Sequence, residues 1–209
     1  LRVAAVTCTL GMSIAVILKS TGWQNWLMPR SAMVAFVPIF GPIEESGQAS
    51  ANALVPVIRQ ACADKNVEVL VLHINSPGGS ASEAERINAA ISQCKQQDGG
   101  QAKKVYAVLD GMATSAAYLI AMKSDRIYAG KYTLVGSIGS IIRYTDISAL
   151  ASRWGIRERV FKTSPLKGGV SMLSGSNPQA DAASQALVND MGQVFLKEVL
   201  NDRKDKLNI

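Results

Sequence analysis

A serine and a pair of glycines stand at two turns that the sequence predicts to lie close together. Ser115 follows the apolar run 105–109 and opens a helical pattern, and Gly78 and Gly79 follow the apolar run 67–74 in the same way. Strand, turn and helix in this order predict an α/β fold with both turns at one edge of a parallel sheet. There a serine hydroxyl could act as a nucleophile, and glycine amides could bind an oxyanion.

The number of histidines in the chain limits which residue could act as the base that activates this serine. The chain has one histidine, His73, so a Ser-His-Asp triad would have to use it. His73 lies inside an apolar run, where the sheet sets the direction of its side chain. We expect a structural or partly exposed strand position for it, and a lysine as the base. A desolvated lysine whose pKa falls from roughly 10.4 to about 7 or 8 can accept the serine proton.

Two lysines downstream are candidates for this base. Lys162 and Lys167 both lie in the segment 161–169. Leu166 and two glycines flank Lys167, a setting that can hold a lysine in a poorly hydrated place. Lys103 and Lys104, by contrast, are expected to form a solvated pair before a strand.

Four blocks in a fixed order resemble one known family. They are residues 74–79 (INSPGG), 113–118 (ATSAAY), 121–129 (AMKSDRIYA) and 135–140 (VGSIGS). The chain resembles, over roughly residues 32 to 200, the signal peptide peptidase A (protease IV) family of membrane-anchored Ser-Lys peptidases. The resemblance implies a Clp protease/crotonase-like α/β fold of repeated β-α units with a mainly parallel sheet, preceded by one N-terminal transmembrane helix.

The resemblance also implies roles for individual residues. Ser115 is the expected nucleophile, and a Lys-Ser/Thr-x-x-x-Lys pattern selects Lys167 over Lys162 as the base. Backbone N–H groups would bind the oxyanion, and the expected donors are those of Gly78, Gly79 and Ala116. Asn75 and Ser76 are expected to satisfy amides of the turn. No cofactor is expected, and no metal-ligand spacing is present.

The block around Ser115 departs from the family pattern. The family usually has two glycines between the serine and the tyrosine, whereas this chain has Ala116 and Ala117. We expect the two methyl groups to narrow the cleft rather than abolish the chemistry. Ser115 as a simple helix N-cap is the alternative reading of the same residues.

The resulting functional prediction is a membrane-anchored serine endopeptidase that degrades signal-peptide remnants or other apolar peptides. No internal repeat is present, which resembles the single-copy members of the family. The resemblance implies a ring-shaped homo-oligomer in which Lys167 serves Ser115 of a neighbouring subunit. Two alternatives stay open: a catalytically weak or inactive membrane scaffold with the peptidase fold, and a crotonase-like acyl-CoA enzyme.

The N-terminal segment has the composition of a membrane anchor. Residues 3–18 carry no charge and, as a helix, would reach about 24 Å, short of a roughly 30 Å hydrocarbon core. Trp23 and Trp26 suit a membrane interface, and no convincing signal-peptide cleavage site follows. We expect an anchor and interfacial segment at 1–28 and a peptidase domain at 32–209. The resemblance implies a single-pass protein of a bacterial-type inner membrane with an extracytoplasmic catalytic domain.

The net charge and the cysteines do little to narrow the functional prediction. The net charge of +6 comes from scattered residues, without the basic runs and interleaved aromatics of nucleic-acid binders. We expect this charge either to attract anionic lipid headgroups or to have no specific role. Cys8 falls in the anchor, and Cys62 and Cys94 are expected to be small core residues on apolar helix faces.

Periodicity predicts alternating strands and helices. The expected strands are residues 33–40, 67–74, 105–109 and 126–128, with a further candidate at 159–161. The expected helices are residues 51–62, 81–96, 115–123, 147–154 and 179–203.

Overall fold

The computed structural model describes residues 32–96, 102–175 and 177–204, and the backbone of three short strands nearer the N-terminus. The chain forms two compact units. The first unit comprises Leu1–Ile138 and Val199–Ile209, and the second comprises Gly139–Glu198. Ser115 belongs to the first unit and Lys167 to the second.

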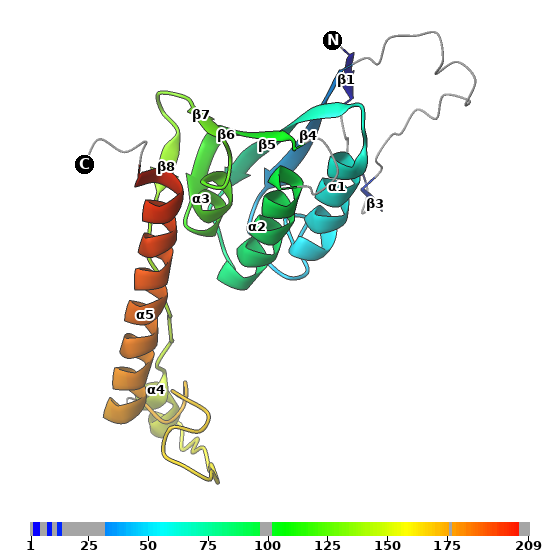
Figure 1. Ribbon diagram of the computed structural model, residues 1–209. Helices are drawn as coiled ribbons and strands as arrows, with labels where there is room; N and C mark the ends of the chain where they lie inside the picture. The colour runs from blue at the N-terminus through cyan, green and yellow to red at the C-terminus, as the bar shows by residue number, and fades with distance from the viewer. Residues whose placement is uncertain are drawn as a thin grey trace. The chain divides into compact units, whose positions relative to one another are not determined.

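A six-stranded sheet runs through the first unit (Figure 1), with strand order β1-β4-β5-β6-β7 and with β8 also paired to β6. The pairings are all parallel, which confirms the predicted α/β class. The strands are β1 (Arg2–Ala4), β4 (Met33–Phe40), β5 (Val67–Ser76), β6 (Lys104–Thr114), β7 (Arg126–Ala129) and β8 (Leu134–Gly136).

Three helices cover one face of this sheet (Figure 1): α1 (Ala51–Ala63), α2 (Ala81–Lys95) and α3 (Ala116–Ala121). Each of the first two begins after a serine N-cap, Ser50 for α1 and Ser80 for α2. The helices bury one stripe each, because apolar residues recur every three or four positions. The core between helices and sheet includes Leu54, Ile58, Leu70, Leu72, Ile74, Ile87, Ile91 and Val105.

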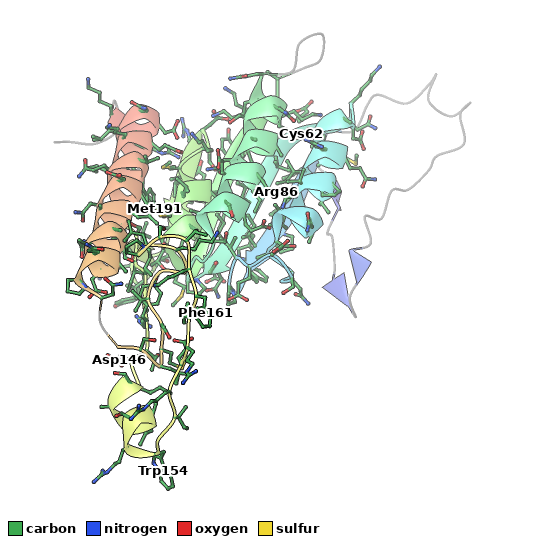
Figure 2. The ribbon with its side chains drawn as sticks, turned by 90° about the horizontal axis from the view of Figure 1, so that it is seen from below. Cys62, Arg86, Asp146, Trp154, Phe161 and Met191 are labelled. Atoms are coloured by element: carbon green, nitrogen blue, oxygen red, sulfur yellow. A yellow bond between two sulfur atoms is a disulfide. The ribbon has the colours of Figure 1, made fainter. Side chains whose placement is uncertain are left out.

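A disulfide joins α1 to α2, which corrects the prediction that both cysteines are simple core residues. Cys62 and Cys94 are bonded, with their Cα atoms 5.4 Å apart, and Figure 2 labels Cys62 on α1 beside α2. Both residues are buried, as expected from their helix faces. The same two helices are also tied by Arg86, whose guanidinium donates to Asn52 Oδ1 (2.7 Å) and to Glu83 Oε1 (3.0 Å).

The second unit contains α4 (Ser148–Arg153) and most of α5 (Pro178–Arg203). The predicted strand at 159–161 is wrong, because these residues form no strand. Trp154 and Phe161 are 76% and 95% exposed in this chain, and both are labelled in Figure 2. Helix α5 runs out of the second unit at Glu198 and into the first unit at Val199.

The predicted N-terminal anchor lies largely outside the described residues. The parts that are described are strands rather than helix: β1, β2 (Cys8–Thr9) and β3 (Met12–Ser13). The last two pair antiparallel. Among the helices that the structure describes, none has the length and apolar composition needed to cross a membrane.

Candidate functional site

Ser115 occupies a strained turn between β6 and α3. Its φ is 53° and its ψ is −125°, a conformation that residues with a β-carbon rarely adopt and that concentrates at functional sites. The turn is held by two backbone hydrogen bonds, from Ser115 N–H to Gly136 O (2.8 Å) and from Leu119 N–H to Ser115 O (3.0 Å). The side chain makes no capping hydrogen bond to α3. Ser115 therefore stands at the N-cap position of α3 without capping the helix through its side chain, and the residue is half-buried.

The turn after β5 packs directly against this serine. A β-carbon built on Gly78 would lie 2.5 Å from Thr114 O, 2.8 Å from Ser115 Cβ and 2.9 Å from Ala116 N. The two turns are also joined by a hydrogen bond of 3.0 Å from Thr114 Oγ1 to Pro77 O. The structure thus brings together the glycine turn and the serine turn, which are separated by more than thirty residues of sequence.

The expected oxyanion donors differ in their hydrogen bonding. The Gly78 N–H donates to Ser76 Oγ at 3.1 Å, which confirms that Ser76 satisfies an amide of the turn. Gly78 is buried and Gly79 is exposed. Within the described part of the chain, the N–H groups of Gly79 and Ala116 have no hydrogen-bond partner. These two amides are therefore the ones free to bind a ligand oxygen.

Ile43 holds the glycine turn from the other side. This role was not predictable, because in sequence Ile43 is only an apolar residue of a loop. Its N–H donates to Gly78 O (2.9 Å) and its carbonyl accepts from Ser80 N–H (2.8 Å). A β-carbon on Gly79 would lie 2.3 Å from Ile43 O. Both glycines are therefore required by close backbone approaches, at φ +91° for Gly78 and +149° for Gly79.

The block at 135–140 contributes to the serine turn through its backbone. Gly136, the last residue of β8, accepts the Ser115 N–H. Ser137, the next residue, is the other described non-glycine with a positive φ, at 54°. Sequence reasoning singled out this block as a family signature but not as a support for Ser115.

His73 lies close to an acidic residue within the neighbouring strand β6. Its Nε2 lies 3.6 Å from Asp110 Oδ2, and its side chain is 38% exposed. Its ring packs edge-on against Phe40, with the centroids 5.0 Å apart. This is the partly exposed strand position that the sequence predicted.

Lys167 lies on an exposed turn of the second unit. Its N–H donates to Ser164 O at 3.1 Å, and its side chain is exposed in this chain. The expected poorly hydrated setting is thus not formed within a single chain. Lys103 is the lysine that is buried: its Nζ donates to the carbonyls of Asp64 and Val67, and burial lowers its pKa, opposed by the charge of Asp64. The prediction of a solvated Lys103 was wrong.

The two alanines after Ser115 point into the protein rather than into an open cleft. Ala116 and Ala117 are 3% and 0% exposed. Their methyl groups therefore pack in the core, and the expectation that they narrow a cleft is wrong. The described residues include no group of three or more His, Cys, Asp or Glu side chains arranged to hold a metal ion.

Comparisons with known proteins found a matching family model, similar proteins and similar solved structures. The model of peptidase family S49 matches residues 97–209. Protease 4 of Salmonella typhi is 30% identical over 161 residues, which are 77% of this chain and 25% of that protein. A protein of Enterococcus faecium named "Putative signal peptide peptidase SppA" is 29% identical over 145 residues, 69% of this chain and 41% of that protein.

The chain thus spans about a quarter of the first relative and about two fifths of the second. Among solved structures, a mutant of the 1510-N membrane-bound stomatin-specific protease aligns with a TM-score of 0.44 and 16% identity. That alignment covers 82% of this chain and 72% of the other.

Proposed function

Because the chain belongs to peptidase family S49, we propose that it is a serine-type endopeptidase with Ser115 as its nucleophile. The observation that carries the proposal is the serine turn itself. Ser115 has a positive φ and a hydroxyl without a capping bond, and Gly78 lies against it. A strained strand-to-helix turn of this kind exposes a serine nucleophile in other hydrolases.

The chemistry would follow the usual course of acyl transfer. Ser115 Oγ attacks the peptide carbonyl carbon while a neutral Lys167 Nζ takes the hydroxyl proton and then delivers it to the leaving amine. The acyl-serine ester is then hydrolysed by a water that Lys167 deprotonates, which frees Ser115.

The oxyanion of each tetrahedral intermediate would be bound by the amides of Ala116 and Gly79. Both lack a partner within the described part of the chain. Gly78 could join them only by giving up its bond to Ser76 Oγ. One such donor is typically responsible for a rate factor of about 10² to 10³.

Lys167 must lose much of its hydration to act as a base near neutral pH. It is exposed in the single chain, so we propose that the bound peptide and a neighbouring subunit cover it. Trp154 and Phe161, both exposed on the second unit, are the kind of apolar surface that subunit contacts bury. The active form would then be a ring-shaped homo-oligomer that shares its sites between subunits.

The proposed substrates are apolar peptides at a membrane, including signal-peptide remnants. The uncharged stretch 3–18 supports a membrane anchor, and the Enterococcus faecium relative carries a signal peptide peptidase name. An extracytoplasmic position of the catalytic domain is supported by the Cys62–Cys94 disulfide, because such bonds persist in oxidising compartments.

An irreversible serine-directed fluorophosphonate tests the proposal on the full chain solubilised in detergent. We expect covalent labelling at Ser115, mapped by mass spectrometry, and loss of labelling in Ser115→Ala and Lys167→Ala. Lys162→Ala is the matched lysine control and His73→Ala the control against a histidine base, and both should keep wild-type labelling.

Mixing the Ser115→Ala and Lys167→Ala chains tests the shared site. Restored labelling in verified mixed oligomers supports sharing, and its absence counts against it. A folded, assembled wild type that is not labelled at all would overturn the proposed peptidase and favour an inactive scaffold.

A further inference from the structure

The helix that begins immediately after Ser115 is short, so its far end bears on the nucleophile. Helix α3 has six residues and is therefore about 9 Å long. Because the helix is so short, a displacement of its C-terminal end would also displace Ser115 at its start. A contact that holds that end therefore bears on the position of Ser115.

Arg203, the last residue of α5, holds that end. Its Nη2 donates to Ala121 O at 3.3 Å and to Ser124 O at 2.8 Å. Arg203 is 6% exposed. Its Nη2 makes both of these hydrogen bonds, whereas its Nε is buried without a hydrogen-bond partner among the described residues. The two hydrogen bonds from Nη2 therefore stabilise one position of α3 relative to the end of α5.

The surroundings of Arg203 keep it in place. Asp202, the preceding residue, forms an ion pair of 2.7 Å with Lys123 Nζ just beyond α3. Burial lowers the pKa of the Arg203 guanidinium, and the charges of Tyr118, Asp202 and Asp125 oppose that change. An arginine stays protonated in such a setting, so the contact with the two carbonyls persists across the working pH range.

Helix α2 supports the same end of α3 with two further contacts. Asn88 Nδ2 donates to Leu119 O and Lys95 Nζ donates to Lys123 O, both at 2.9 Å. Both donors come from a helix that lies wholly in the first unit. Arg203 differs from them because α5 spends its first 21 residues, up to Glu198, in the second unit.

We propose that Arg203 is a positioning residue for Ser115: its hydrogen bonds to Ala121 and Ser124 fix α3 and thereby the aim of the nucleophile. The inference rests on the proposed peptidase function and names a residue that the four sequence blocks do not include. Arg203, Ala121, Ser124 and Ser115 all belong to the first unit.

The test compares Arg203→Met with wild type in two independent measurements on the full chain. The first is the rate of Ser115 labelling by the fluorophosphonate, separated into probe affinity and maximal inactivation rate. The second is hydrogen exchange of the amides of residues 116–124. We expect the maximal rate to fall about 10- to 100-fold with unchanged affinity, since a misplacement of about 1 Å can cost that much, and the α3 amides to exchange faster.

Matched variants separate positioning from general damage. Arg59→Met makes the same change at an exposed site on α1 and should alter neither measurement. Arg203→Lys keeps the charge but not the planar fork and should fall between wild type and Arg203→Met; it decides the question if Arg203→Met does not fold.

Labelling of a folded Arg203→Met chain at the wild-type rate, or unchanged exchange in α3, would overturn the inference. Failure of the proposed function looks different, because the wild type itself would then not be labelled.

Discussion

Gly78 lies so close to Ser115 that the turn after β5 has no room for a side chain. A β-carbon on Gly78 would lie 2.8 Å from Ser115 Cβ and 2.5 Å from Thr114 O. Real β-carbons do not approach other atoms this closely, and the φ of +91° excludes most other residues independently. The close contact with the glycine turn therefore restricts the position of Ser115.

Replacing Gly78 by alanine should remove the activity of Ser115. The added methyl must displace Ser115 or the Ala116 amide, and both are proposed to act on the same carbonyl group of the substrate. We expect the rate of fluorophosphonate labelling to fall by more than about 100-fold, together with a lower melting temperature. Labelling kinetics and thermal unfolding of the same preparation measure the two effects.

Gly155→Ala is the matched control for this substitution. Gly155 also has a positive φ, +69°, but no atom lies within 4 Å of its hypothetical β-carbon. It should lose about 1 kcal/mol of stability from backbone strain and keep wild-type labelling. Equal losses of labelling in both variants would show that strain, and not the contact with Ser115, is responsible.

The pairing of Gly78 with Ser115 was predictable from sequence, and the physical reason is general. Apolar runs of strand length, each followed by a turn and a helical pattern, produce parallel strands whose carboxyl ends share one edge. The predicted strand at residues 33–40 agrees with β4 in its bounds, and the predicted α1 is one residue short. Local sequence patterns suffice to predict a strand or helix where the spacing of apolar residues fits only one of the two.

The contacts that sequence reasoning missed depend on how elements meet in space. Periodicity placed Cys62 and Cys94 on buried helix faces but could not show that those faces adjoin. Lys103 was expected in water because lysines usually are, whereas the carbonyls of Asp64 and Val67 receive its ammonium group. The prediction of a strand at 159–161 was wrong, because a residue pattern typical of strands does not ensure that a neighbouring strand is present to pair with it.

Removing the Cys62–Cys94 bridge should destabilise the first unit. The bond closes a loop with a sequence separation of 32 residues, and native disulfides of this size typically contribute about 2 to 4 kcal/mol. We expect Cys62→Ala/Cys94→Ala to unfold at lower urea concentration than the oxidised wild type. The reduced wild type should approach the double variant.

The third cysteine provides the control for the bridge. Cys8→Ala leaves Cys62 and Cys94 in place and should keep the stability gap between oxidised and reduced protein. A wild type whose urea midpoint does not respond to reductant would show that the bridge does not stabilise the fold.

Ala117→Gly restores a residue that the family pattern usually has, yet it should not open the site. The Ala117 methyl is fully buried, so its loss leaves a small void and adds backbone freedom within α3. We expect a cost of about 1 to 2 kcal/mol, the sum of helix propensity and lost burial, and an unchanged preference among peptide substrates. Urea unfolding and a peptide-library digest measure the two.

Ala149→Gly in α4 measures the cost of lower helix propensity alone, for comparison with Ala117→Gly. Ala149 is exposed in a helix of the same length, so its replacement should cost about 1 kcal/mol or less. A changed cleavage preference in Ala117→Gly alone would mean that the residue does face substrate.

Asp125 should make the stability of the first unit depend on acid pH. Burial alone would raise its pKa, but the hydrogen bond from Val105 N–H (2.8 Å) and the ion pair with Lys95 (3.0 Å) outweigh it, so the pKa lies below its ordinary value. A carboxyl with a depressed folded pKa stabilises the fold fully above its unfolded pKa of about 4, and that contribution is lost as pH falls through the folded value.

Asp125→Asn should therefore be less stable than wild type at pH 7 by about 1 kcal/mol or more, since a hydrogen bond to a charged acceptor is lost. The gap should close as the pH falls below about 4, because the wild-type carboxyl is then protonated as well. Urea unfolding at pH 7, 5 and 3 measures it, with Glu45→Gln, an exposed carboxylate of the loop before α1, expected to stay within about 0.5 kcal/mol of wild type. A gap that persists unchanged at pH 3 would mean that Asp125 supports the start of β6 by its shape and not by its charge.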